Sequence, residues 1–295
     1  MPGLERVRQP ALAEANPIPP DRTSWGTWEI LGEQSLTLQH HIVENAAMLA
    51  DKQADPVARK IGMLYAAGMD EAAREAAGYT PIQATLDEIA ALKSGQEVAD
   101  YIRRRHAEGD GQLFVFGAVA DFRSADMQVA SADEADSRLP TKDYYTAAEY
   151  APIRQAYLAY ITRSFELTGS PHDVAAAQAR DVLAFDSRLA AARLTPVEAR
   201  EPHNQFHFVT IAEANKITPH FPWNKFFETQ GVDVGSGFSL SQPRYFAALD
   251  RQLATAPIEQ WRAYLRFSAI DNASRYLSKA FVDNSFEFYG KTLAG

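Results

Sequence analysis

The 295-residue sequence contains no cysteine, no long hydrophobic run and no excess of positive charge. Without cysteine it cannot form disulfides, thiolate zinc sites or iron–sulfur clusters, and it has no cysteine nucleophile. No stretch approaches the roughly 18 apolar residues of a membrane span, and the opening residues lack the features of a secretory signal. Acidic residues number 38 against 29 basic ones, a balance that repels phosphate backbones. We therefore expect no membrane span in this chain and no nucleic-acid partner.

The pattern of apolar residues predicts a mainly α-helical fold. At 46% hydrophobic and 23% charged residues, the chain can bury a large core. Apolar residues spaced by three, four or seven positions indicate a long core-facing helix over residues 28–49. Proline and glycine punctuation predicts further helices: residues 56–67, 71–77, 147–167, 171–193, 243–254 and 257–280, with another from Pro196 onward.

Strand signals are few. Residues 113–122 (LFVFGAVADF) are β-branched and aromatic and form the best strand candidate, whereas residues 133–136 suggest an acidic loop and residues 232–240 a loop or short strand. We therefore expect one large multi-helix domain with at most a short β-hairpin or small sheet. Residues 1–17 are rich in proline and predict an extended lead-in segment.

Two pairs of histidines suggest metal binding, but the first pair lacks a neighbour and the second pair lacks the spacing that a catalytic zinc site requires. His203 and His207 have the spacing of the zinc-peptidase motif HExxH, yet Asn204 occupies the position of the catalytic glutamate and cannot accept a proton. We interpret them as loop histidines. His40 and His41 are adjacent, so they point to different faces of a helix. We expect no metal site and no catalytic residue in this chain.

The run Arg103-Arg104-Arg105-His106 is the only dense basic segment. It could contact an anion or nucleic acid. Positive charge is also favoured at the C-terminal end of a helix by the backbone dipole. We interpret this run as the exposed end of a helix.

Six strings in order resemble the N-terminal half of the neprilysin and endothelin-converting-enzyme family of zinc metallopeptidases. Three of them are similar to the family patterns "LY.SGMDE", "LP.RDYY" and "F.FYGKTL.G". The strings are IPPDRTSWG (18–26), KIGMLYAAGMDE (60–71), LPTKDYY (139–145), REP (200–202), WRAYLR (261–266) and FEFYGKTLAG (286–295). The lack of cysteine resembles the bacterial members.

The resemblance implies that residues 18–295 form the helical lobe that covers a catalytic lobe of the same polypeptide. That lobe would enclose a chamber that admits peptides and excludes folded proteins. In the family, the HExxH motif and the remaining zinc ligand follow the part matched here. The resemblance therefore implies zinc and peptide hydrolysis for the intact protein, and a noncatalytic role for this chain.

Some family members place two arginines and an acidic residue of this lobe near the substrate. By position these places are Ser24, Glu29 and Gly32, so only the carboxylate is retained. Because docking of a peptide's C-terminal carboxylate depends on an arginine fork, we expect endopeptidase behaviour from the intact protein. A second departure is that Asp136-Ser137-Arg138 replaces the family's glycine-rich turn before Leu-Pro.

A different class of function stays open. The chain could be a free-standing peptide-binding or interaction protein derived from this lobe. A reading frame that continues past Gly295 into HExxH would favour the enzyme, and a natural stop would favour the binding protein. The compartment is undetermined, with periplasmic, extracellular and cytoplasmic locations all open. An exposed apolar face is expected where the other lobe docks.

Overall fold

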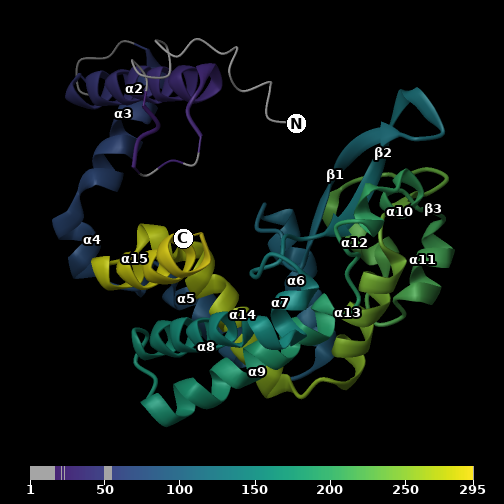
Figure 1. Cartoon of the computed structure of the whole chain (residues 1–295). Helices are drawn as coiled ribbons and strands as arrows, with labels where there is room; N and C mark the ends of the chain where they lie inside the picture. Colours follow the sequence, from purple (N-terminus) through teal and green to yellow (C-terminus); the bar gives the residue numbers. More distant parts are fainter. Residues whose placement is uncertain (1–16, 21, 23, 50–54, 295) are drawn as a thin grey trace, which may run out of the picture. The chain divides into compact units, whose positions relative to one another are not determined.

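The computed structural model describes residues 17–20, 22, 24–49 and 55–294. The chain divides into two compact units, Met1–Ala73 and Arg74–Gly295 (Figure 1). Helices dominate and one four-stranded sheet is present, which confirms the predicted mainly α fold with a small sheet. Most of the predicted lead-in segment lies outside the described residues. Within the described ranges, no helix is long and apolar enough to cross a membrane.

The first unit contains a pair of packed helices, α2 (Thr27–Met48) and α3 (Pro56–Met69). Asp55 caps α3 by accepting a hydrogen bond from the backbone N–H of Val57 at 2.9 Å, and Pro56 fits the first helical position because its missing N–H would have no partner there. The two helices touch closely where Gly62 meets Ala46. A Cβ on Gly62 would lie 2.1 Å from the Ala46 carbonyl oxygen, so the crossing requires glycine.

Helices form most of the second unit. The boundary between the units falls within α4 (Glu71–Ala77). The α-helices that follow are α5 (Gln83–Ala91), α6 (Gly95–Ala107), α7 (Lys142–Thr146), α8 (Ala151–Glu166), α9 (His172–Ala190), α10 (Pro202–Gln205), α11 (Ile211–Ile217), α12 (Trp223–Gln230), α13 (Pro243–Thr255), α14 (Ile258–Ala273) and α15 (Lys279–Ser285). A π-helical segment, Phe286–Leu293, follows α15.

Two predicted helices are shorter than expected. The segment after Pro196 forms only a 3-10 turn, Glu198–Arg200. Thr195 and Glu198 do make the reciprocal bonds of a capping box, but Pro202 disfavours helical backbone at Glu201, which is extended. The helix predicted over 257–280 ends at Ala273 and is followed by a 3-10 turn and α15.

The sheet has the order β1-β2-β4-β3. β1 (Phe114–Asp121) and β2 (Ser124–Glu134) form an antiparallel hairpin; β2 runs parallel to β4 (Phe238–Leu240), which pairs antiparallel with β3 (Phe208–Val209). The predicted strand over 113–122 is confirmed. The predicted acidic loop at 133–136 begins inside β2, whose alanines, serines and acidic residues have little strand preference of their own.

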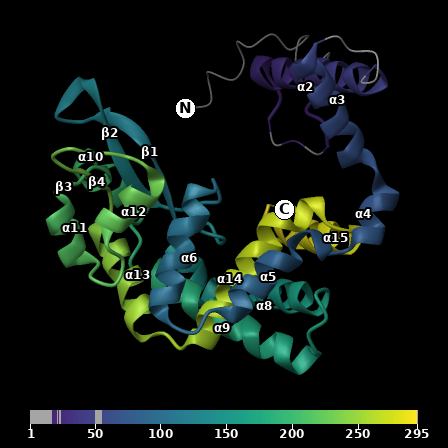
Figure 2. The ribbon, with the colours of Figure 1, turned by 180° about the vertical axis from the view of Figure 1, so that it is seen from behind.

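Two aromatic groups form the core of the second unit. One joins the sheet to α12 and α13, with the Phe114 and Trp223 rings 5.5 Å apart. The other lies among α8, α9 and α14, where Phe185 and Trp261 are 4.6 Å apart. Figures 1 and 2 show α8, α9 and α14 side by side, with the β1–β2 hairpin projecting from another part of the unit beside α10 and β3.

Candidate functional site

The three predicted substrate-facing positions lie at and just before the start of α2. The Ser24 hydroxyl donates to the Glu29 carboxylate at 2.9 Å. Gly32 follows one helical turn later, and a Cβ added there would meet nothing within 4 Å. The structure therefore brings Ser24 and Glu29 together and leaves open space at Gly32.

The Glu29 carboxylate is stabilised in its charged form. Its own backbone N–H and the Ser24 hydroxyl bond to it and hold its pKa below the usual value. A carboxylate in the first turn of a helix is also favoured by the helix dipole. No sequence pattern marked the nearby Arg22, whose positive charge acts on Glu29 and whose guanidinium forms an ion pair with Glu33. One guanidinium is therefore present in this region, although not at the positions that correspond to the family arginines.

The apolar face of α2 is exposed. We call Trp28, Leu31, Leu38, Ile42 and Leu49 the α2 stripe; Trp28 is 85% exposed, and the other four are between 46% and 61% exposed. The prediction of a core-facing helix over residues 28–49 is therefore wrong. The periodicity shows that one face is apolar, but it does not say which surface covers it. A row of large apolar side chains on one helix face is typical of a docking surface.

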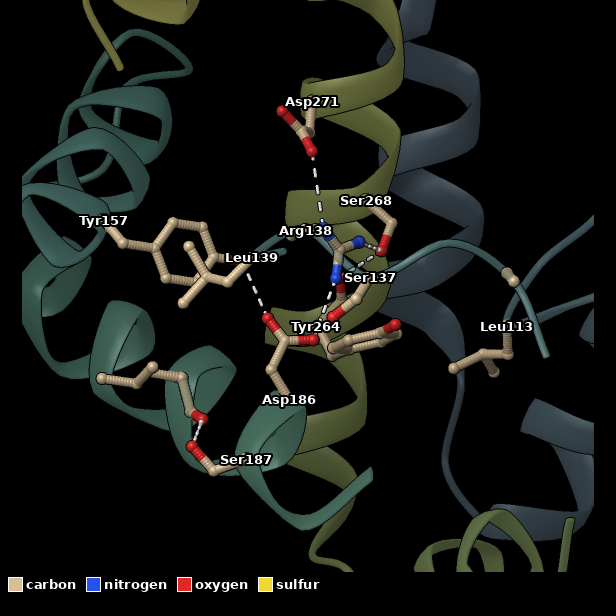
Figure 3. A network of polar contacts seen from close by, with 12 residues as sticks. Leu113, Ser137, Arg138, Leu139, Tyr157, Asp186, Ser187, Tyr264, Ser268 and Asp271 are labelled. Atoms are coloured by element: carbon tan, nitrogen blue, oxygen red, sulfur yellow. Dashed lines mark hydrogen bonds and ion pairs between the residues drawn. The ribbon is translucent and has the colours of Figure 1, made fainter. Parts of the chain in front are cut away.

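A buried ion cluster occupies the centre of the second unit, and we call Arg138, Asp186, Ser268 and Asp271 the Arg138 cluster (Figure 3). Arg138 lies in the segment between β2 and α7, and its guanidinium is 3.1 Å from Asp186 on α9 and 3.4 Å from Asp271 on α14. It also donates to the Ser268 hydroxyl. The ring of Tyr264 stacks against the guanidinium, with 4.9 Å between the guanidinium carbon and the ring centroid. The cluster thus joins two helices and a loop.

Tyrosine hydroxyls complete the cluster. Tyr157 donates to Asp186 at 2.7 Å and Tyr160 donates to Asp271 at 2.5 Å. Burial raises the pKa of Asp186, although Arg138 and Tyr157 act in the opposite direction. Burial alone would lower the pKa of Arg138, but Tyr264 and the two carboxylates outweigh it and raise that pKa well above the usual value.

A polar cavity of about 160 Å³ lies beside the Arg138 cluster. It borders Leu113, a non-glycine residue with φ of 69° whose carbonyl accepts a hydrogen bond from the Tyr245 hydroxyl at 2.7 Å. Left-handed backbone at such a residue is strained and persists only where the surroundings fix it. Because each carboxylate of the cluster has both Arg138 and a tyrosine hydroxyl as partners, we interpret it as a structural centre.

His203 and His207, considered as a pair of metal ligands, do not lie on one helix. His203 is in the short helix α10, which ends at Gln205, so His207 does not share a helix face with it. Among the residues that the structure describes, no group of three or more histidine, aspartate or glutamate side chains could hold a metal ion.

The basic run 103–106 ends α6 as predicted, but only part of it is exposed. Arg104 pairs with Glu88. Arg103 is buried, with 7% of its surface exposed, and the His106 ring stacks on Phe114 at 4.1 Å. The prediction of an exposed helix end is therefore confirmed for Arg104 but wrong for Arg103 and His106, because α12 and β1 pack against this turn.

The sequence is similar to one protein-family model and to several well-described proteins. A model described as peptidase family M13 matches residues 11–295. Endothelin-converting enzyme 1 of Mus musculus is 23% identical over 289 residues, which cover 93% of this chain and 37% of the relative. Neprilysin-3 of Drosophila melanogaster is 25% identical over 232 residues, 75% of this chain and 29% of that protein. The chain therefore spans 37% of the first relative and 29% of the second.

Two solved structures share the fold of this chain. The zinc metalloprotease Zmp1 of Mycobacterium tuberculosis in its open state has a TM-score of 0.84 at 26% identity, and the match covers 94% of this chain and 43% of that one. PepO of Lactobacillus rhamnosis HN001 has a TM-score of 0.79 at 16% identity, over 95% of this chain and 44% of that one. The second match shows the fold alone.

Proposed function

The chain belongs to peptidase family M13, and from that premise we propose that it is the noncatalytic helical lobe of a neprilysin-like zinc metalloendopeptidase. Residues 18–295 would cover the active site and limit substrates to peptides. One observation carries the proposal: the family match takes in residues 11–295, yet the chain covers only 37% of endothelin-converting enzyme 1. We assign peptide-bond hydrolysis to a catalytic lobe of the same polypeptide.

A lid of this kind acts by positioning and by excluding water. A substrate held in a closed chamber reacts faster because its orientation is set in advance and competing solvent is removed. Both effects require a body that keeps its shape. The Arg138 cluster and the two aromatic groups of the second unit support such a body. The cluster and one aromatic group connect α8, α9 and α14 through buried contacts, and the other aromatic group joins the sheet to α12 and α13.

Zinc belongs to the proposed catalytic lobe. A catalytic zinc ion needs three protein ligands and an open position for water. The described residues of this chain do not fit that requirement, because they contain no group of three or more suitable side chains. In this proposal, no step of peptide hydrolysis depends on a metal ion held by this chain.

The α2 stripe supports the proposed contact with the catalytic lobe. Its exposed tryptophan, leucines and isoleucine would be costly to leave in water and would gain by burial against a complementary surface. We propose that this stripe packs on the catalytic lobe. Such packing would bring the start of α2, including Ser24, Glu29 and Gly32, toward the chamber.

We propose that Ser24, Glu29 and Gly32 face the bound peptide. The Glu29 carboxylate would repel a substrate's terminal carboxylate and accept hydrogen bonds from its backbone or cationic groups. The open space beside Gly32 would allow a peptide chain to pass instead of ending there. This arrangement favours endopeptidase over dipeptidyl-carboxypeptidase specificity.

The test compares the chain alone with the chain supplied with a catalytic lobe. The purified 295-residue chain is expected to leave a set of fluorogenic peptides uncleaved. The protein that also contains an HExxH segment is expected to cleave them, to lose activity with a chelator and to regain it with zinc. Chelator-sensitive hydrolysis by the 295-residue chain alone would contradict the proposal.

The reading frame distinguishes the alternative function, a free-standing peptide-binding protein, from the proposed one. A natural stop after Gly295, with no HExxH segment in the same gene, would favour a free-standing peptide-binding protein. In that case the α2 stripe would require a different partner, and a chain that stays monomeric with the stripe exposed would argue against docking altogether.

A further inference from the structure

A groove lies beneath the projecting β1–β2 hairpin in the second unit. β2 pairs with β4 only at Ser131 and Ala132, so the part of β2 that precedes them has no neighbouring strand on that side. Between it and the loop of residues 232–237 is an open space of about 590 Å³, within the usual range for ligand pockets of roughly 300–1,000 Å³. Figure 1 shows the hairpin extending beside α10 and β3.

The hairpin tip is fixed at the far end of this groove. The Phe122 ring stacks on Phe206, with centroids 4.9 Å apart and ring planes 9° from parallel. The Arg123 guanidinium lies 3.5 Å from the centre of the Phe208 ring and bonds to Asp121. The groove is therefore bounded at one end by these tip contacts and at the other by the β2–β4 pairing.

The main chain of β2 offers hydrogen-bonding groups to the groove. The Ser241 N–H donates to the Ala132 carbonyl at 3.0 Å, so the polar groups of Ala132 face β4. Residues two positions apart in a strand direct their N–H and C=O groups to the same edge. Because Ser131 pairs with Ser239, the Ala130 carbonyl is already directed at β4, and the groups left facing the groove are the Ala130 N–H and the N–H and C=O of Gln128. An extended peptide carries donors and acceptors at the matching spacing.

The side chains of the groove leave room for a second backbone and carry little net charge. Gly117, Ala118 and Ala130 are small, and small residues in a strand permit close approach of another chain. Arg123 is neutralised by Asp121. Such a surface suits small or β-branched uncharged side chains and offers no cationic site for a phosphate.

From these contacts we propose that the groove binds an extended segment of a peptide substrate, which adds as a strand along β2. The inference rests on the proposed function, because it takes a peptide substrate as the occupant. It adds a second contact with the substrate, on the hairpin of the noncatalytic lobe and distinct from Ser24, Glu29 and Gly32. A second copy of this chain pairing through β2 is the alternative occupant that the experiment must separate.

The test measures binding of a fluorescein-labelled heptapeptide, Lys-Thr-Val-Ala-Val-Thr-Lys, to the 295-residue chain by fluorescence anisotropy. Ala118→Phe, which fills the groove, is expected to weaken binding about tenfold or more. Val119→Phe is the matched control, because the neighbouring residue points to the opposite face of the same strand, and it is expected to bind as the wild type does. Circular dichroism checks that both variants are folded.

A modified probe separates main-chain pairing from side-chain contact. The same heptapeptide with N-methyl groups on alternate amides keeps its side chains but loses the donors along one edge, so we expect its binding to be lost. Equal binding of the two probes, or equal binding by the Ala118→Phe and wild-type chains, would overturn the proposal. So would a sedimentation result in which Ala118→Phe converts a dimer into a monomer, since the occupant would then be a second copy.

Failure of this inference can be told apart from failure of the proposed function. If the protein with its HExxH segment cleaves peptides and Ala118→Phe leaves KM and kcat unchanged, the groove proposal fails and the lobe assignment stands. If the chain binds the heptapeptide but no catalytic lobe accompanies it, the lobe assignment fails and the groove stands as a peptide site.

Discussion

The Arg138 guanidinium lies 3.1 Å from the Asp186 carboxylate, and both groups are largely buried in the second unit. Breaking a buried pair leaves one charge without compensation, which costs far more than losing an exposed pair. The Arg138 cluster is therefore the first place to test whether the second unit depends on a single side chain.

Arg138→Met is expected to lower the free energy of unfolding by about 3–5 kcal/mol, because Asp186 and Asp271 lose their buried cation. Urea titration followed by tryptophan fluorescence measures the change. The control is Arg163→Met on α8, where a loss below about 1 kcal/mol is expected. The Arg163 side chain is 55% exposed, and its guanidinium is 3.2 Å from the Glu166 carboxylate. Equal losses in the two variants would show that burial of the Arg138 cluster is energetically unimportant.

Stability should depend on pH through His106. Burial lowers the pKa of this imidazole, although Gln112 and Asp110 act in the opposite direction, so the folded state prefers the neutral ring. The contribution is complete above the unfolded pKa of about 6.5 and is lost as the pH falls through the lower folded pKa. As the pH is lowered from about 6.5 through the folded pKa, the free energy of unfolding of the wild type is expected to decrease. The decrease is expected to be smaller in His106→Gln. His203→Gln, at an exposed position, should keep the wild-type slope; identical slopes in all three proteins would contradict the assignment.

Gly62→Ala is expected to separate α2 from α3, because the new Cβ would lie 2.1 Å from the Ala46 carbonyl oxygen. Overpacking of this kind typically costs about 1–3 kcal/mol. Hydrogen exchange read by mass spectrometry should show faster exchange in both helices. Gly68→Ala is the matched control in the same helix, where a Cβ meets nothing within 4 Å and alanine gains up to about 1 kcal/mol of helix preference. Unchanged exchange in Gly62→Ala would mean that the two helices do not depend on this contact.

Replacing Trp28 and Leu38 together by serine is expected to leave the fold intact and to reduce self-association of the chain, because both side chains belong to the exposed α2 stripe. Sedimentation velocity over a range of protein concentrations measures the effect. Tyr276→Ser, at an exposed aromatic position in the second unit, serves as the control and should not change association. A double variant that unfolds would instead show that the stripe supports its own unit.

Local signals made most helix positions predictable. The start of α3 follows from Asp55 and Pro56, because capping depends on only a few neighbouring residues. The starts of α9 and α13 follow from Pro171 at the N-cap and Pro243 at the first helical position. β2 was not predicted because its strand state depends on pairing with β1, as at Val119 and Val129. That pairing is a tertiary effect.

The candidate sites show the same division between local and long-range information. The contact between Ser24 and Glu29 lies within one helix start, so sequence position alone could suggest it. The burial of Arg138 depends on Asp186 and Asp271, which are distant in the sequence, and only the departure from the family's glycine-rich turn marked this position beforehand. The exposure of the α2 stripe could not be predicted either, since periodicity identifies an apolar face but not whether another surface covers it.

The Arg138 cluster also determines when the second unit can fold during synthesis of the chain. The guanidinium leaves the ribosome well before Asp186, Ser268 and Asp271, and a charge without its partners is costly to bury. The hairpin and α8 can form early, but the centre of the second unit cannot close until α14 has emerged. Folding of the second unit during translation is therefore held back until α14 has emerged, and a nascent polypeptide stalled before α14 would expose its aromatic side chains to chaperones.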